Sequence, residues 1–235
     1  MVPTWLRLPK QPNERNSSMR VTRMVLTGSM AALILLLSAT LVMAQIVINE
    51  IDYDQDGTDA AEFLELKNVS ANTVDLDGWV VELVNGSGGG AVVYLSIALP
   101  AYSLAAGDYY VICANTANTI HCDLDVTPDT NLIQNGAPDG VGLRDPNNIL
   151  IDAVSYEGDT GAPYTEGSGV GLVDDPAIAY SGISRYPDGV DTNQNNVDFS
   201  PRCITPGEAN DSLDANCLQP VTTSINSWGA MKARY

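Results

Sequence analysis

IVINEIDYDQDGTDAAEFLELKN, residues 46–68, is the stretch that decides the fold. Two strand-length apolar runs, Ile46–Ile51 and Glu62–Asn68, flank an Asp-rich segment. The same alternation of short apolar runs with Gly, Pro, Asn and Asp continues along the chain, and no window of a dozen residues has helical apolar spacing without a breaker. We therefore also predict strands at Trp79–Val84, Ala91–Leu99, Tyr109–Ala114, Val141–Arg144, Ile149–Tyr156 and Gly182–Arg185.

Short strands of this number cannot bury their apolar faces singly, and two sheets packed face to face are the ordinary solution. The sequence therefore predicts an all-β fold built as a β-sandwich. A long connection rich in Gly, Asp and Pro is predicted at Glu157–Tyr180. Loops of that length are usually functional or disordered, so we expect this one on the surface.

The N-terminus has the order of a secretory signal, because Arg20 and Arg23 precede a long apolar run that ends in small residues at Ala44. We predict a signal segment with a polar leader at residues 1–44, cleaved after Ala44. The chain is then secreted or attached to the cell surface, with its domain at 45–210 and no membrane span. The alternative is an uncleaved anchor, because about 18 apolar residues can just span a bilayer.

The chain is strongly acidic after residue 44. The leader holds five of the eleven basic residues and one of the 29 acidic ones, which leaves six basic residues, 28 acidic residues and a formal charge of −22. Such a surface repels a phosphate backbone, so we do not expect direct nucleic-acid binding. Strong acidity is typical of solubility, salt tolerance or binding of divalent cations.

Four cysteines, Cys113, Cys122, Cys203 and Cys217, follow the predicted signal. An even number of cysteines in an exported chain indicates disulfides. Three pairings are open, and closeness in sequence favours Cys113–Cys122 and Cys203–Cys217, each worth about 2–3 kcal/mol in the chain-entropy model. A zinc site is the alternative, although neither pair has metal-ligand spacing and His121 is the only histidine.

Several short pieces follow one another in a characteristic order: Ile48–Ile51, Glu62–Asn68, Asp75–Trp79, Gly182–Gly189 (GISRYPDG), Asp198–Phe199 and Thr205–Asn210 (TPGEAN). Taken together, they resemble the lamin tail domain family of the bacterial secreted type. The resemblance runs from about Ile46 to Asn210. It implies an immunoglobulin-like β-sandwich, which agrees with the strand count, and the loops at 115–140 and 157–180 make this copy longer than the compact form.

Two carboxylates, Glu50 and Glu65, are expected on neighbouring strands. Paired carboxylates can perform acid–base chemistry, but in such strands they commonly accept hydrogen bonds from loop amides or an arginine, here Arg185. Templates for hydrolases, metalloproteases and P-loop enzymes are absent from the sequence. We therefore expect no catalytic residues and no enzyme activity.

Oxygen-bearing side chains at alternate positions form two candidate calcium clusters. The candidate ligands are Asp52, Asp54 and Asp56 in the first cluster, and Asp191, Asn193, Asn195 and Asp198 in the second. The first is not an EF-hand, because the closing glutamate would fall at Phe63 and a strand precedes it. The alternative for the second cluster is an Asx-rich turn. No other cofactor is expected.

Residues 211–235 are predicted to be a linker and tail. Their last nine residues, SWGAMKARY, resemble the Trp-Gly-x-x-Lys termini of some exported bacterial proteins, which implies a sorting tag; a frayed terminus is the alternative.

We expect a non-catalytic extracellular module for binding, adhesion or structure, with a protein or glycan partner. One alternative is an accessory role in a secreted nuclease system, because lamin-tail-like domains resemble accessory segments of bacterial extracellular nucleases. Another is a surface protein stabilised by calcium.

Overall fold

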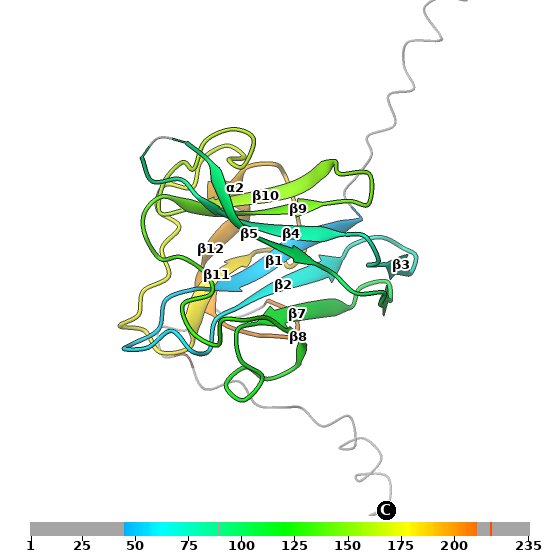
Figure 1. Ribbon diagram of the computed structural model, residues 1–235, viewed down its shortest axis with the longest axis horizontal. Helices are drawn as coiled ribbons and strands as arrows, with labels where there is room; N and C mark the ends of the chain where they lie inside the picture. Colours follow the sequence, from blue (N-terminus) through cyan, green and yellow to red (C-terminus); the bar gives the residue numbers. More distant parts are fainter. Residues whose placement is uncertain (1–44, 89, 211–216, 218–235) are drawn as a thin grey trace, which may run out of the picture. The chain divides into compact units, whose positions relative to one another are not determined.

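Strands β1 (Ile46–Asp52) and β2 (Phe63–Asn68) lie side by side in the middle of the larger of two main sheets (Figure 1). They pair antiparallel over their whole length, and the polar segment between them connects them at one end of the sheet. The structure is a computed structural model that describes residues 45–88, 90–210 and 217. In this part of the chain the predicted all-β fold is confirmed.

The larger sheet has the order β12-β11-β1-β2-β7-β8. Its other members are β7 (Tyr109–Cys113), β8 (Cys122–Asp125), β11 (Ser181–Arg185) and β12 (Phe199–Cys203). Only β7 and β8 pair parallel in this sheet, within the described residues; the other neighbours are antiparallel. Both strands of the 46–68 stretch are therefore interior strands, each hydrogen-bonded on two sides.

The smaller sheet has the order β10-β9-β4-β5 and is antiparallel throughout. Its strands are β4 (Val80–Asn85), β5 (Val92–Ala98), β9 (Asp139–Arg144) and β10 (Leu150–Tyr156). A two-residue ribbon of β3 (Val74–Asp75) and β6 (Ser103–Leu104) and the single-turn helix α2 (Asn195–Asp198) complete the described elements.

The two sheets share one apolar core. Ile48 and Leu64 of the larger sheet and Leu83 and Val141 of the smaller one are fully buried members of the same cluster. Burying each such side chain favours the fold by about 1.5–3 kcal/mol. The arrangement is the predicted immunoglobulin-like sandwich.

Eight strands predicted from the apolar runs are all present, with ends that differ by one or two residues. The prediction missed β3, β6, β8 and β12. The segment from 157 to 180 contains no strand or helix, as expected for a long loop, and it lies against the domain: Glu157 N donates to Leu172 O over 2.8 Å.

Both predicted disulfides are confirmed. Cys113 at the end of β7 is bonded to Cys122 at the start of β8, and Cys203 at the end of β12 is bonded to Cys217, with Cα–Cα distances of 5.8 and 5.1 Å. Zinc ligation by these cysteines is therefore wrong.

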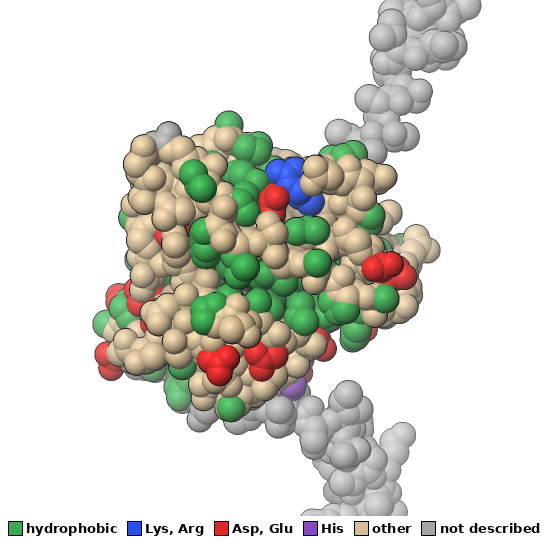
Figure 2. All heavy atoms as spheres, viewed as in Figure 1, with side chains coloured by type: hydrophobic (Ala, Val, Ile, Leu, Met, Phe, Trp, Pro, Cys, Tyr) green, Lys and Arg blue, Asp and Glu red, His purple; other side chains and the backbone are tan. Residues whose placement is uncertain are grey.

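The predicted signal segment at 1–44 lies outside the described residues, as does the tail at 211–235 except for Cys217, and both stay predictions. A search of the described residues for a helix long and apolar enough to span a membrane finds none. On the face drawn in Figure 2, acidic side chains appear in several places around the rim, while basic side chains gather in one.

Candidate functional site

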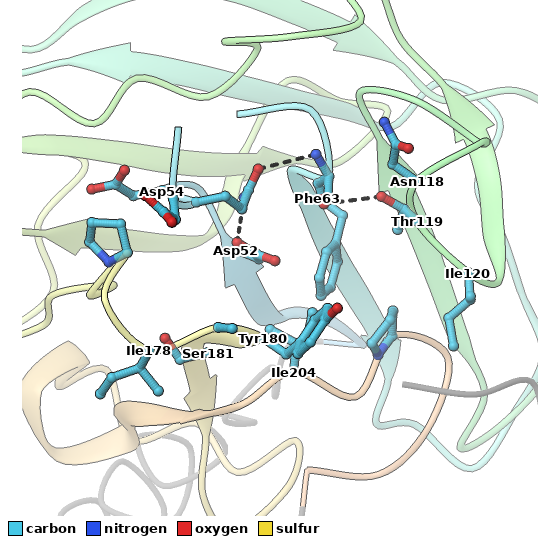
Figure 3. A pocket seen from close by; sticks show the side chains of 16 residues that line it. Asp52, Asp54, Phe63, Asn118, Thr119, Ile120, Ile178, Tyr180, Ser181 and Ile204 are labelled. Atoms are coloured by element: carbon cyan, nitrogen blue, oxygen red, sulfur yellow. Dashed lines mark hydrogen bonds between the residues drawn. The ribbon is translucent and has the colours of Figure 1, made fainter. Parts of the chain in front are cut away.

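A pocket of about 230 Å³ lies at the end of the larger sheet where β1 ends and β2 begins (Figure 3). Its walls come from four segments that are far apart in the sequence: 52–63, 118–120, 176–181 and 204–206. The first connects β1 to β2, the second follows β7, the third belongs to the long loop before β11, and the last follows β12. Loops therefore form the pocket, and the sandwich holds them in place.

One part of the wall is apolar. Phe63, Ile120, Ile178 and Ile204 line it together with Tyr180. Figure 3 shows Ile120 on the side of the pocket away from the carboxylate of Asp54. Ile178 and Tyr180 are 38% and 42% exposed, so they form the rim, whereas Phe63 is fully buried at the base.

The segment that follows β1 is fixed by Gln55. Its Nε2 donates to Asp52 Oδ1 over 2.6 Å, its Oε1 accepts from Ala61 N at 3.1 Å, and its own backbone N donates to Asp59 Oδ1 over 3.0 Å. Thr119 Oγ1 also donates to Ala61 O over 3.0 Å, which ties the second wall to the first. Hydrogen bonds thus fix the segment between β1 and β2 and join it to the second wall.

Asp174 connects the long loop to the end of β1 from behind the pocket. Its Oδ2 accepts from the backbone N of Tyr53 and of Asp54, at 2.9 and 3.1 Å, and its Oδ1 accepts from Ser181 Oγ at 3.3 Å. Asp174 is 1% exposed, and burial raises its pKa to about 7.

The carboxyl groups of Asp52 and Asp174 interact with each other. Burial, followed by the charge of Asp174, raises the pKa of Asp52 well above its usual range, and a hydrogen bond between the two carboxyl groups raises the pKa of Asp52 while lowering that of Asp174. Asp174 also accepts from three donors outside this pair, Tyr53 N, Asp54 N and Ser181 Oγ. The pocket therefore contains a buried carboxyl group that has no basic neighbour among its described lining residues.

The disulfide between Cys113 and Cys122 supports the apolar wall. Phe63, Val111, Cys113 and Ile204 form a small buried cluster against which Cys122 packs. Two of these residues, Phe63 and Ile204, line the pocket. The covalent bond thus lies directly beneath the site.

Three aspartates and no lysine, arginine or histidine are found among the described lining residues. The described basic residues make contacts elsewhere: Lys67 with Asp188, Arg144 with Glu82, Arg185 with Asp152, and Arg202 over the ring of Tyr186. The negative charge of the pocket is therefore not balanced by the described part of the chain.

The first predicted calcium cluster falls in this pocket. Asp52, Asp54 and Asp56 all line it, and they range from 2% exposed at Asp52 to the exposed side chain of Asp56. Among the described residues, three acidic side chains with oxygens within 4.8 Å of one another occur at a different place, Asp152–Glu166–Asp191. Calcium at Asp52, Asp54 and Asp56 stays a prediction.

The second predicted cluster surrounds Arg185. Asp198 Oδ2 accepts from Arg185 Nη1 at 3.1 Å and from Thr192 N at 2.8 Å, and Asp191 Oδ1 accepts from the Arg185 Nη1 at 3.2 Å. Asp191 also accepts from Asn193 N at 2.9 Å, which is an Asx turn.

Asn195 lies apart from that arginine. Its Nδ2 donates to Ala153 O over 2.8 Å, and its Oδ1 accepts from Ser155 N at 3.0 Å, so it covers the outer edge of β10. The side chains of Asp191, Asn195 and Asp198 thus have structural partners, and calcium binding by the second cluster stays a prediction.

Glu50 and Glu65 lie directly opposite each other on β1 and β2, as expected. Glu50 Oε2 accepts from Thr205 N at 2.9 Å, and Glu65 Oε2 accepts from Gly207 N at 2.7 Å, so both carboxylates hold the segment after β12. The expectation that Arg185 donates hydrogen bonds to Glu50 and Glu65 is wrong. Glu50 pairs in register with Ser184, and because side chains alternate along a strand, Arg185 points to the other face of the sheet.

Sequence reasoning found the acidic side of the pocket and missed the rest. Asp174 and the apolar residues Ile120, Ile178 and Ile204 carried no local signal, since each lies in an irregular segment. The one hint was the length and composition of the loop at 157–180, which supplies Asp174 and Ile178.

Comparison with known families gives one match: the model of the lamin tail domain covers residues 42–158. No curated protein matches the chain. The match ends just after β10, while β11 and β12 beyond it complete the larger sheet beside β1.

Proposed function

The chain belongs to the lamin tail domain family, a family of non-enzymatic immunoglobulin-like domains, and we propose that it is an extracellular, non-catalytic binding module. Its binding site is the loop-built pocket beside Asp52, and its partner is a protein or a glycan. The single observation that carries the proposal is that four separated segments converge on one pocket, and that Gln55, Thr119 and Asp174 tie the first three of them together there.

The hydrogen bonds that Asp52 and Asp174 make disfavour catalysis at this pocket. A carboxyl pair that shares a proton can act as a catalytic dyad when both members reach a common water. Here Asp174 lies behind Asp52, is 1% exposed, and is saturated by two backbone amides and Ser181. The absence of a histidine from the described wall, beside Asp52, supports binding rather than turnover.

Export is supported by the two disulfides, because such bonds persist in oxidising compartments. The predicted signal at 1–44 and the predicted sorting tail at 211–235 belong to the same proposal: a mature domain that is secreted or held at the cell surface. The formal charge of −22 after residue 44 disfavours nucleic acid as the partner.

Expression of the full chain in a secreting host tests export. Intact mass and N-terminal sequencing of the exported product should show that it begins at Gln45. A product that keeps residues 1–44 and stays with the membrane fraction would contradict cleavage and favour the anchor.

Retention experiments with the exported chain test binding. The chain is immobilised and exposed to the extracellular fraction of the producing organism, with or without protease treatment, and to a glycan array. Retention of one specific protein or glycan is expected, and loss of retention in the rim variant Ile178→Asp would place it at the pocket. Turnover of any substrate by the pure chain, or cleavage of DNA or RNA with Mg²⁺, would overturn the proposal; the latter would favour the nuclease alternative.

A further inference from the structure

We propose that the pocket beside Asp52 binds a primary ammonium group carried on an apolar stem. The chemistry is that of a lysine side chain on a partner protein or of a free alkylamine. The inference rests on the proposed function, because it names the chemical class that the same pocket recognises.

The size of the pocket fits a side chain better than a whole ligand. Its volume of about 230 Å³ is below the roughly 300–1,000 Å³ of pockets that enclose drug-sized molecules. The rim residues Ile178 and Tyr180 are 38% and 42% exposed, so the pocket opens to solvent. A linear group can therefore enter with its charged end first.

The apolar wall supplies the contact for the stem. Phe63, Ile120 and Ile204 line one region of the pocket, and the Cys113–Cys122 bond packs behind Phe63 and Ile204. Each methylene removed from water at such a surface strengthens binding by about fourfold. A hydrated metal ion would make no use of this wall.

The acidic side supplies the contact for the ammonium. Asp52, Asp54 and Asp56 line the pocket, and the described wall contains no lysine, arginine or histidine to balance them (Figure 3). Elsewhere in the described residues the most buried ion pair, Arg185 with Asp152, is complete within the chain. An ammonium has three N–H donors and one positive charge, which match carboxyl groups that have no positively charged neighbour in the described wall.

The geometry favours an organic cation over a metal. The oxygens of Asp52, Asp54 and Asp56 are not among the described groups of three that lie within 4.8 Å of one another, the spacing that a metal shell requires. Asp52 Oδ1 is also already used, since it accepts from Gln55 Nε2 at 2.6 Å. Separated carboxyl groups around an apolar wall suit a donor that hydrogen-bonds in several directions.

Titration of the exported chain, labelled with ¹⁵N, tests the inference. The probes are n-pentylamine, n-pentanol, pentanoate, N-acetyl-lysine N-methylamide and CaCl₂, and the readout is the shift of backbone amide signals. We expect n-pentylamine to shift the signals of residues 54–56, 118–120 and 178–181 saturably, with a Kd of about 1 mM or lower. The alcohol should bind about tenfold more weakly, and the carboxylate should not bind.

Variants measure separately how much the acidic side and the apolar wall contribute to binding. Asp54→Asn should weaken amine binding about three- to tenfold and leave alcohol binding unchanged. Ile178→Ser should weaken both. Asp108→Asn makes the same change of charge at an exposed position that does not line the pocket, and it should change neither. Thermal unfolding of each variant shows that it is folded.

The two sources of the ammonium are separated by the probes: binding of the blocked lysine assigns a protein side chain, and binding of pentylamine alone assigns a small amine. Any of three results would overturn the inference. These are equal binding of amine and alcohol, no saturable shift with either amine, or the same shifts with Ca²⁺ and none with amines. Retention of a partner that amines do not displace would leave the proposed function standing, while amine binding without any retained partner would overturn only the proposed function.

Discussion

Arg185 and Asp152 form an ion pair that is closed to solvent: Nη2 lies 2.9 Å from both carboxylate oxygens, and both side chains are 0% exposed. The guanidinium also donates to Ile48 O over 2.7 Å and to Asp198 Oδ2 over 3.1 Å, and it lies over the ring of Phe199. One side chain thus joins β1, β10, β11 and the helix before β12. Such planar, multidirectional donation is specific to arginine.

Arg185→Lys should therefore lower the free energy of unfolding by about 3 kcal/mol or more, because lysine cannot satisfy all these acceptors and leaves buried carboxylate oxygens without a donor. The measurement is urea denaturation of the exported chain. Arg144→Lys is the matched control: its pair with Glu82 is 19% and 14% exposed, and a loss of about 1 kcal/mol or less is expected. Equal losses in the two variants would show that Arg185 has no special role.

The sequence predicts the interior strands of this fold better than its edge strands. The interior runs, such as 46–51 and 62–68, are apolar enough to be recognised without tertiary information. Strand β8 reads Cys-Asp-Leu-Asp and β12 contains Pro201, and both are edge strands of their sheet, where charge and proline are tolerated. Such strands form because of the strands they pair with, so the conformational preferences of their own residues do not reveal them.

The candidate site is predictable to a smaller extent for the same reason. The aspartates after β1 stand out as a local pattern, whereas Asp174 reaches Tyr53 N from 121 positions away. The sequence suggests Arg185 as a donor to Glu50 and Glu65, and the register of β1 and β11 decides otherwise. Spacing in sequence identifies residue types, and register decides which of them meet.

Glu166 makes the free energy of unfolding of the protein depend on pH. Its Oε2 is buried without a hydrogen-bond partner, and burial, followed by the charges of Asp152 and Asp191, raises its pKa from 4.5 to about 8. Between these values the folded state keeps a proton that the unfolded state releases, so the free energy of unfolding falls as the pH rises through this window.

Glu166→Gln removes that titration. The variant should equal the original chain in denaturation midpoint near the acid end of the window and exceed it at pH above about 8, where the original carboxyl must ionise beside two others. Asp108→Asn, at an exposed position, controls for the change in net charge. Parallel midpoint curves for the original chain and Glu166→Gln from acid to alkaline pH would contradict this account.

Calcium binding, which is proposed from the aspartate patterns, can be detected from the melting temperature of the chain. A cation that binds the native state raises the melting temperature, by the equivalent of about 2.7 kcal/mol at a concentration 100 times its Kd. If either cluster binds calcium, added calcium raises the melting temperature of the exported chain over a sample with chelator. No difference between the two samples would show that the clusters serve only as hydrogen-bond acceptors.

Two exposed substitutions would assign the calcium effect to a cluster. Asp56→Asn removes a charge from the first cluster, and Asn193→Gly removes a ligand from the second while allowing the positive φ of 57° at that position. The variant in which calcium no longer raises the melting temperature identifies the site. The other variant then serves as its control.

The Cys113–Cys122 bond should stabilise both the fold and the pocket. Cys122→Ala removes the cross-link and leaves the Cys113 sulfur in its buried cluster with Phe63 and Ile204, whereas the double alanine variant removes the sulfur as well. The single change should cost about 2–3 kcal/mol through the unfolded chain, and the further loss in the double variant measures packing. Guanidinium denaturation gives both values, and amide signals of residues 118–120 report the pocket wall. If the double variant were as stable as the single one, the disulfide would act on the unfolded chain alone and the wall beneath the pocket would not depend on it.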